Sequence, residues 1–128
     1  MNKHLLSTIA MLAFTAVSGA ALAAEAGLQI TLGTTADFER RTLNYDCGTD
    51  TPLTVTYLNA APNFLAIVPV EGEAEPLIFA SAISASGARY VSGQWVWWTK
   101  GPEAQLFDET LGEDAEAVST CSEIVNTP

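Results

Sequence analysis

Apolar and polar residues alternate in short runs along most of the chain, and turn-forming residues separate these runs at intervals of about 8–12 residues. In Leu53–Leu58, for example, Leu53, Val55 and Tyr57 alternate with the residues between them. A period of two places alternate side chains on opposite faces of a strand. The pattern predicts strands at Thr42–Tyr45, Leu53–Leu58, Phe64–Val68, Pro76–Ala80, Ala88–Ser92, Gln94–Thr99 and Glu103–Phe107, and a last segment at Ser119–Val125.

The first 23 residues follow a different pattern, which is typical of a secretory signal peptide. Lys3 and His4 precede an apolar stretch at residues 5–17, and Ala21-Leu22-Ala23 supplies the small residues that a signal peptidase needs. We expect cleavage after Ala23 or one residue later. The alternative is a membrane anchor, for which the stretch is short, because a helix needs about 20 residues to cross a bilayer.

The position of the first cysteine bears on localisation. A bacterial lipoprotein carries a cysteine directly after the cleavage site, whereas the first cysteine here is Cys47. The sequence therefore predicts a protein of the periplasm that is secreted through a cleaved signal peptide, is not a lipoprotein and is not anchored to the membrane in its mature form.

Cleavage after Ala23 leaves 105 residues (128 − 23), enough for one small domain. We expect an N-terminal extension at residues 24–42, with a short strand at Leu28–Leu32, and one domain at residues 43–128. Seven or eight short antiparallel strands imply an all-β barrel or sandwich, and closure favours a barrel because it removes exposed strand edges. Leu111–Val118 is ambiguous between a strand and a short helix, because its acidic residues favour a helix start.

Charge and composition exclude several functions. The net charge is −10, and removing residues 1–23 makes it 4 − 15 = −11 and takes away His4, the only histidine. An acidic chain does not suit nucleic acid, whose binding needs clustered basic residues. Without histidine, Ser–His–Asp and Cys–His catalysis and His-ligated zinc are excluded. Glu71, Glu73 and Glu75 have the composition of a calcium site without its ligand spacing, so we expect a solvated turn, no metal and no cofactor.

The two cysteines are expected to form a disulfide. The periplasm is oxidising, so two cysteines in an exported chain pair more readily than they persist as thiols. Cys47 and Cys121 lie 74 residues apart, and a bond between them encloses most of the mature chain. In the chain-entropy model a loop of this length stabilises by roughly 4–4.5 kcal/mol.

Two segments carry a resemblance to a known family. They are Ser84–Tyr90 (SASGARY) and Trp97–Ala104 (WWTKGPEA), and a Tyr45-Asp46-Cys47 opening and the late Cys121 agree with them. Over Leu43–Phe107 the chain closely resembles the inhibitors of c-type lysozyme, a family with membrane-anchored and periplasmic forms. The resemblance implies an antiparallel β-barrel of about eight strands, and the missing lipidation cysteine points to the periplasmic branch. Since periplasmic relatives can dimerise, a homodimer is compatible with it.

The resemblance also implies a mechanism without catalysis. In the family, a Ser-Gly-Ala-basic-Tyr loop enters the lysozyme active-site cleft, and a serine and a lysine engage the two catalytic carboxylates, which protects bacterial peptidoglycan from host enzyme. Carried over by motif, these two residues are Ser86 and Lys100. The other expected lysozyme-binding residues are Gly87, Ala88, Arg89 and Tyr90. Arg89 stands where the family often has lysine, and its planar guanidinium is not interchangeable with an ammonium group.

Elementary chemistry supports this hypothesis. A c-type lysozyme works with a protonated Glu and an ionised Asp on either side of the scissile bond. A narrow loop of small residues fits a sugar-shaped cleft, a hydroxyl suits the acid, and a cation suits the anion through charge-assisted hydrogen bonds. Arg89 and Lys100 are two of only four basic residues left after cleavage, and the acidic remainder attracts a basic partner.

Other interpretations of the same residues stay open. Ser84–Gly87 is also compatible with an ordinary hairpin loop, and Tyr90 with either a core or a rim position. Trp95, Trp97 and Trp98 suggest a carbohydrate- or peptidoglycan-binding module of the cell envelope. However, in a strand Trp95 and Trp97 share one face and Trp98 takes the other, so at least one face is expected in the core. A glycosidase has carboxylates to draw on, but no feature of the sequence pairs them.

Overall fold

The computed structural model describes residue 19, residues 27–31 and residues 37–126. The signal peptide expected at residues 1–23 lies outside these residues except for Gly19, so it stays a prediction. Residues 27–31 have no regular secondary structure, whereas a strand was expected at Leu28–Leu32. Among the described residues, we find no helix that is both long enough and apolar enough to cross a membrane.

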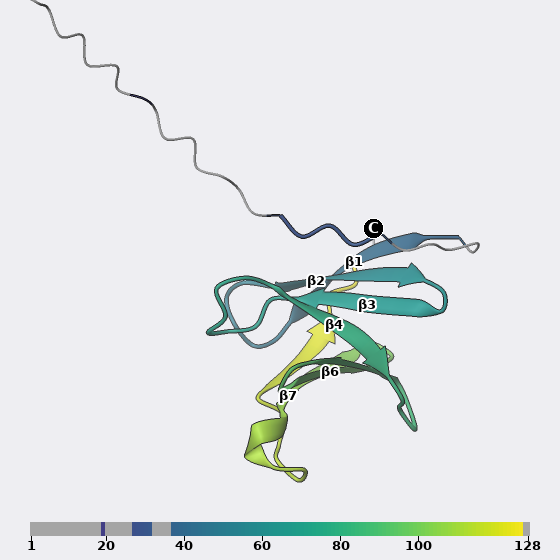
Figure 1. Ribbon diagram of the computed structural model, residues 1–128. Coiled ribbons are helices and arrows are strands. Elements are labelled where there is room, and N and C mark those ends of the chain that lie inside the picture. Colours follow the sequence, from purple (N-terminus) through teal and green to yellow (C-terminus); the bar gives the residue numbers. More distant parts are fainter. Residues whose placement is uncertain (1–18, 20–26, 32–36, 127–128) are drawn as a thin grey trace, which may run out of the picture. The chain divides into compact units, whose positions relative to one another are not determined.

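Eight antiparallel strands follow one another in sequence order around a closed barrel (Figure 1). They are β1 (Glu39–Asp46), β2 (Leu53–Ala60), β3 (Asn63–Val68), β4 (Leu77–Ala82), β5 (Ala88–Ser92), β6 (Trp95–Lys100), β7 (Glu103–Asp108) and β8 (Ser119–Glu123). This arrangement confirms the predicted all-β barrel of about eight strands. The first strand starts at Glu39, within the segment that was expected to be an extension.

The barrel closes where β8, yellow in Figure 1, lies between β7 and β1. Only Tyr45–Glu123 and Asp46–Ser122 pair β1 with β8, whereas seven residue pairs join β1 to β2. The Cys47–Cys121 disulfide lies directly beside this short pairing and joins residues 74 positions apart, which confirms the expected bond. Because the closing strands come from the two ends of the barrel sequence, the covalent link acts where loop-closure entropy opposes pairing most.

A hydrogen-bonded aromatic group occupies the barrel interior. Trp97 is fully buried, and Tyr45 packs edge-on against it at 5.4 Å between ring centroids. The Trp97 Nε1–H donates to the Tyr57 hydroxyl at 2.9 Å, and the Tyr57 and Tyr45 hydroxyls are 2.8 Å apart. These partners satisfy the polar atoms that burial removes from water. Burial raises the pKa of the Tyr57 hydroxyl well above its ordinary value, so this group stays protonated and able to donate.

Neither alternative for Leu111–Val118 is correct, because residues 112–118 form neither a strand nor a helix. A single 3₁₀ turn, η1 (Glu109–Leu111), begins two residues earlier. Asp108 caps it by accepting hydrogen bonds from the Thr110 hydroxyl at 2.6 Å and from the Thr110 N–H at 2.9 Å. These bonds, the hydroxyl first, lower the pKa of Asp108. The capping aspartate, rather than the later acidic residues, therefore decides where the turn starts.

In this topology successive loops alternate between the two ends of the barrel. Loops 61–62, 83–87 and 101–102 share one end, which we call the Ser86 end. Loops 47–52, 69–76, 93–94 and 109–118 share the other, which we call the Glu71 end. In Figure 1 the Ser86 end lies to the right and the Glu71 end, with η1, to the left.

Candidate functional site

The loop between β4 and β5 projects from the Ser86 end and is held at its base. Ile83 is 96% exposed, and Ser86 is also exposed. The carbonyl oxygen of Ser86 accepts hydrogen bonds from the Ser84 hydroxyl at 2.5 Å and from the Trp98 Nε1–H at 2.9 Å. Two donors therefore fix the backbone of Ser86, while its side chain remains on the exposed side of the loop.

Gly87 is required where the loop meets β6. Its φ of +67° lies in the left-handed region, which side chains other than hydrogen disfavour. A Cβ atom there would overlap the carbonyl oxygen of Thr99 and would lie 3.1 Å from two atoms of the Trp98 indole. The close approach of Thr99 and Trp98 and the left-handed backbone therefore both require glycine at position 87.

Lys100 lies beside this loop. It is the exposed last residue of β6 and pairs with Glu103 across the Gly101-Pro102 turn. Ala88, the first residue of β5, pairs with Thr99. The end of β6 therefore runs alongside the start of β5, and Ser86, Gly87, Ala88 and Lys100 gather at the same end of the barrel.

The guanidinium of Arg89 lies elsewhere. Arg89 pairs with Trp98 on β6, and its Nη2 is 3.5 Å from Oε1 of Glu109 in η1, towards the Glu71 end. Gln94 positions η1, because its carbonyl accepts from the Glu109 N–H at 2.9 Å and its Nε2–H donates to Asp108 at 3.1 Å. The Arg89 side chain is 35% exposed, so the ion pair adds little stability but fixes the direction of the arginine.

The sequence did not identify Glu109 as the ion-pair partner of Arg89, because the two residues lie 20 positions apart in the chain. No spacing rule joins two residues whose contact depends on the pairing of β5, β6 and β7. The only sequence signal for this ion pair was the composition, because the chain has many acidic residues and few basic ones.

Tyr90 occupies the core, one of the two positions that its sequence allowed. It is 8% exposed, and its ring lies 5.7 Å from that of Tyr57 at an interplanar angle of 53°. It also lines a small polar cavity of 200 Å³, together with Thr99 and Gly101, which lie at the Ser86 end. Tyr90 therefore supports the candidate site from inside the barrel.

The three tryptophans of β6 divide as the alternation predicts. Trp97 is buried in the core and Trp95 packs against it, whereas Trp98 lies on the outer face and binds the Ser86 carbonyl. The three indoles therefore share no surface on which a sugar chain would stack. Within the part of the chain that the structure describes, no group of three or more His, Cys, Asp or Glu side chains is placed to hold a metal ion.

Replacing Gly87 with alanine is expected to lower the free energy of unfolding by about 2–3 kcal/mol, since it adds a backbone overlap to the strain of a left-handed residue. Gly93→Ala is the matched control, because Gly93 has a φ of +54° and no atom within 4 Å of its Cβ position. We expect it to cost about 1 kcal/mol. Urea unfolding of both variants measures the difference, and equal losses would show that the contact with Thr99 is unimportant.

Comparison with known proteins places these features in a family. The family model for the membrane-bound lysozyme inhibitors of c-type lysozyme matches residues 45–114. A protein of that name from Pseudomonas aeruginosa is 42% identical over 88 residues, which cover 69% of this chain and 68% of the relative. Another from Cupriavidus necator is 35% identical over 121 residues, covering 94% and 95%.

A solved structure agrees with the fold. The crystal structure of Pseudomonas aeruginosa MliC in complex with hen egg white lysozyme contains a chain that superposes with a TM-score of 0.64 at 38% sequence identity. The match covers 78% of this chain and 99% of the other.

These names correct the expected localisation. The sequence predicted a periplasmic protein that is not a lipoprotein and not membrane-anchored, whereas the family and both relatives are named membrane-bound. That prediction was wrong. It relied on the absence of a cysteine after Ala23, which concerns only one of several physical means of membrane attachment.

The barrel, the disulfide and the two sequence motifs therefore agree with the comparisons. The family match covers more than half of the chain, and one relative aligns along almost the whole of it. This chain belongs to the family of membrane-bound lysozyme inhibitors of c-type lysozyme.

Proposed function

We propose that this protein inhibits c-type lysozyme by placing the β4–β5 loop in the active-site cleft of the enzyme, and that it thereby protects bacterial peptidoglycan. The observation that carries the proposal is the adjacency of exposed Ser86 and Lys100, fixed by the bond between Trp98 and the Ser86 carbonyl. A rigid loop loses little conformational entropy on binding, so more of the contact energy appears as affinity. The relative in the solved complex is bound to hen egg white lysozyme, which supports the choice of partner.

In the proposed complex, Ser86 and Lys100 meet the two catalytic carboxylates of lysozyme. The Ser86 hydroxyl bonds to the protonated glutamic acid, and the Lys100 ammonium pairs with the ionised aspartate. Gly87 and Ala88 keep the loop narrow enough for a sugar-sized cleft. The protein performs no catalysis in this proposal and requires no cofactor.

The remaining two motif residues, Arg89 and Tyr90, support the contact residues in this proposal and do not touch the enzyme themselves. Arg89 pairs with Glu109 and lies opposite Trp98 in the β5–β6 register, so we assign it to supporting the strand position of the indole that holds Ser86. Tyr90 is buried and supports the start of β5 from the interior. This chain has Arg89 where the family often has lysine, and this difference therefore leaves the proposed contacts of Ser86 and Lys100 unchanged.

The test is a turbidity assay of lysozyme on bacterial cell walls with the purified protein. We expect inhibition that weakens as salt rises, because a net charge of −10 steers a basic enzyme to the inhibitor and salt screens that attraction. Stopped-flow association should slow by about tenfold or more between low and high salt. Undiminished lysozyme activity at saturating inhibitor would contradict the proposal.

A peptidoglycan-binding module that uses the tryptophans was the other candidate. The burial of Trp97 and the engagement of Trp98 by Ser86 do not favour it. A pull-down with insoluble peptidoglycan, in the absence of lysozyme, separates the two functions. Binding to the polymer without binding to the enzyme would replace the proposal with this alternative.

A further inference from the structure

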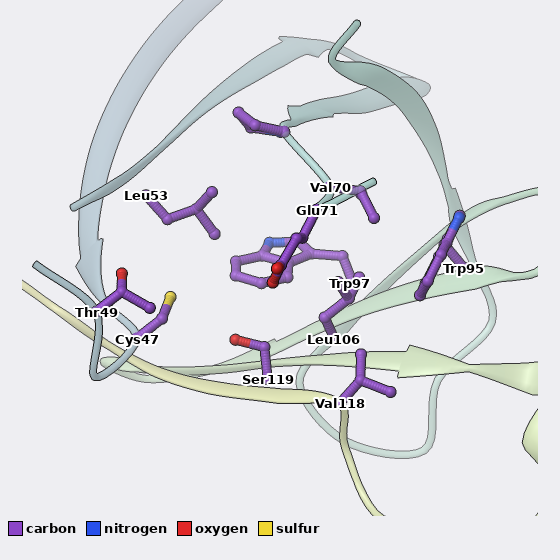
Figure 2. A pocket seen from close by; sticks show the side chains of 11 residues that line it. Cys47, Thr49, Leu53, Val70, Glu71, Trp95, Trp97, Leu106, Val118 and Ser119 are labelled. Carbon is purple, nitrogen blue, oxygen red and sulfur yellow. The ribbon is translucent and has the colours of Figure 1, made fainter. Parts of the chain in front are cut away.

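A cavity of 340 Å³ opens at the Glu71 end, opposite the candidate lysozyme site (Figure 2). The buried core residues Trp97, Val70 and Leu106 form its inner wall, and the more exposed Leu53, Trp95 and Val118 line it further out. Its volume is at the lower end of the range for small-molecule sites and about twice that of a buried apolar cavity that holds benzene. The space therefore suits a short alkyl chain or one or two rings.

Few polar groups interrupt this apolar lining. Thr49, Ser119 and Glu71 contribute oxygen atoms, and Figure 2 shows them among the side chains that surround Trp97. Glu71 carries the only ionisable side chain among the residues that line the cavity. An apolar body with one polar or charged end matches such a lining better than a sugar, which needs many hydrogen bonds.

The charge around the opening is mainly negative. The four loops of the Glu71 end contain eight Asp and Glu residues and no Lys or Arg, and one of these carboxylates, Glu109, is paired with Arg89 of β5. Arg40, Arg41 and Lys100 lie in the parts of their strands nearest the Ser86 end. Clustered carboxylates at a low-dielectric opening attract cations and repel fatty acids or other anions.

We propose that this cavity is a binding site for a small cationic amphiphile, with its ammonium group at Glu71 and its apolar part against Leu53, Trp95 and Val118. The site is separate from the candidate lysozyme contact and independent of the proposed inhibition. It combines a partly enclosed apolar space with an anionic opening in the same loop cluster.

Calorimetric titration with octyltrimethylammonium tests the proposal, with octanoate and octanol as probes of the same chain length and different charge. We expect saturable binding of the cation with a negative heat-capacity change, weaker binding of octanol and no binding of octanoate. Octanoate binding as tightly as the cation, or no saturable binding of the cation, would overturn the assignment.

Two pairs of variants locate the site. Glu71→Gln should weaken octyltrimethylammonium binding by about fivefold and leave octanol binding unchanged. The control Glu73→Gln, in the same loop but outside the cavity lining, should have less than about half that effect. Equal losses in Glu71→Gln and Glu73→Gln would show diffuse attraction and contradict a defined site.

The second pair blocks the opening. Val118 is 48% exposed and lines the cavity, so Val118→Trp should fill the opening without disturbing the core and reduce binding of both octyltrimethylammonium and octanol by more than tenfold. Val125→Trp, at a valine that is 67% exposed and does not line the cavity, is the matched control and should bind like the parent. Near-ultraviolet circular dichroism checks that both variants are folded, and unchanged binding by folded Val118→Trp would overturn the proposal.

Discussion

Replacing both Ser86 and Lys100 with alanine is expected to abolish most lysozyme inhibition while the barrel stays folded. Removing one partner of a buried charged contact typically costs about 2–5 kcal/mol, which corresponds to a loss of about 30-fold or more in affinity. Both side chains are exposed in the free protein, so neither contributes packing to the core. The expected loss therefore arises in the complex, where a catalytic carboxylate of the enzyme is left buried without its partner.

Single and double variants should be compared in the same turbidity assay. Ser92→Ala is the control for serine, because Ser92 lies at the other end of β5. Arg40→Ala is the control for loss of a positive charge, because Arg40 is exposed on β1 and outside the loop contacts. Both controls should inhibit nearly as well as the parent. Full inhibition by a folded Ser86→Ala/Lys100→Ala variant would refute the assignment of these two residues.

Loss of the disulfide is expected to cause the largest change in stability. The Cys47→Ser/Cys121→Ser variant should lose about 4 kcal/mol of unfolding free energy, because an unlinked chain gains the entropy of a 74-residue loop. Domains of this size are stable by about 5–15 kcal/mol, so this loss is a large fraction of the total. The effect should be strong here because only two residue pairs join β1 to β8.

Urea unfolding monitored by tryptophan fluorescence measures this loss. Reduction of the parent protein should give a loss no larger than that of the double substitution, because Cys121 is buried in the core and Cys121→Ser also places a hydroxyl there. Ser122→Ala, next to Cys121 on β8 and exposed, is the control for a local change and should cost less than about 0.5 kcal/mol. A loss below about 1 kcal/mol on removing the disulfide would mean that strand pairing alone closes the barrel.

Sequence reasoning was most successful where structure is local. Alternation with a period of two is a property of neighbouring residues, so it located the strands and predicted that Trp95 and Trp97 share a face opposite Trp98. The family motifs located the loop at Ser86 and the turn after Lys100. The cysteine count led to the single disulfide, because two cysteines allow only one pairing within the chain.

Two of its errors have different causes. At Leu111–Val118 the acidic residues suggested that a helix starts within this segment. In the structure, Asp108 instead caps a single 3₁₀ turn that starts at Glu109. For localisation, a missing cysteine was given more weight than it carries, and the relatives' names corrected that prediction.

By itself, the sequence determined the strand pattern, the faces of those strands, the disulfide and the family, since each depends on short-range pattern or motif. Only the tertiary structure decided that Trp98 holds the Ser86 carbonyl, that Thr99 excludes any residue but glycine at position 87, and that Arg89 faces Glu109. It also revealed the cavity at the Glu71 end. These features depend on the register of strands that are distant in sequence, and register is set by the packing of the whole barrel rather than by any one segment.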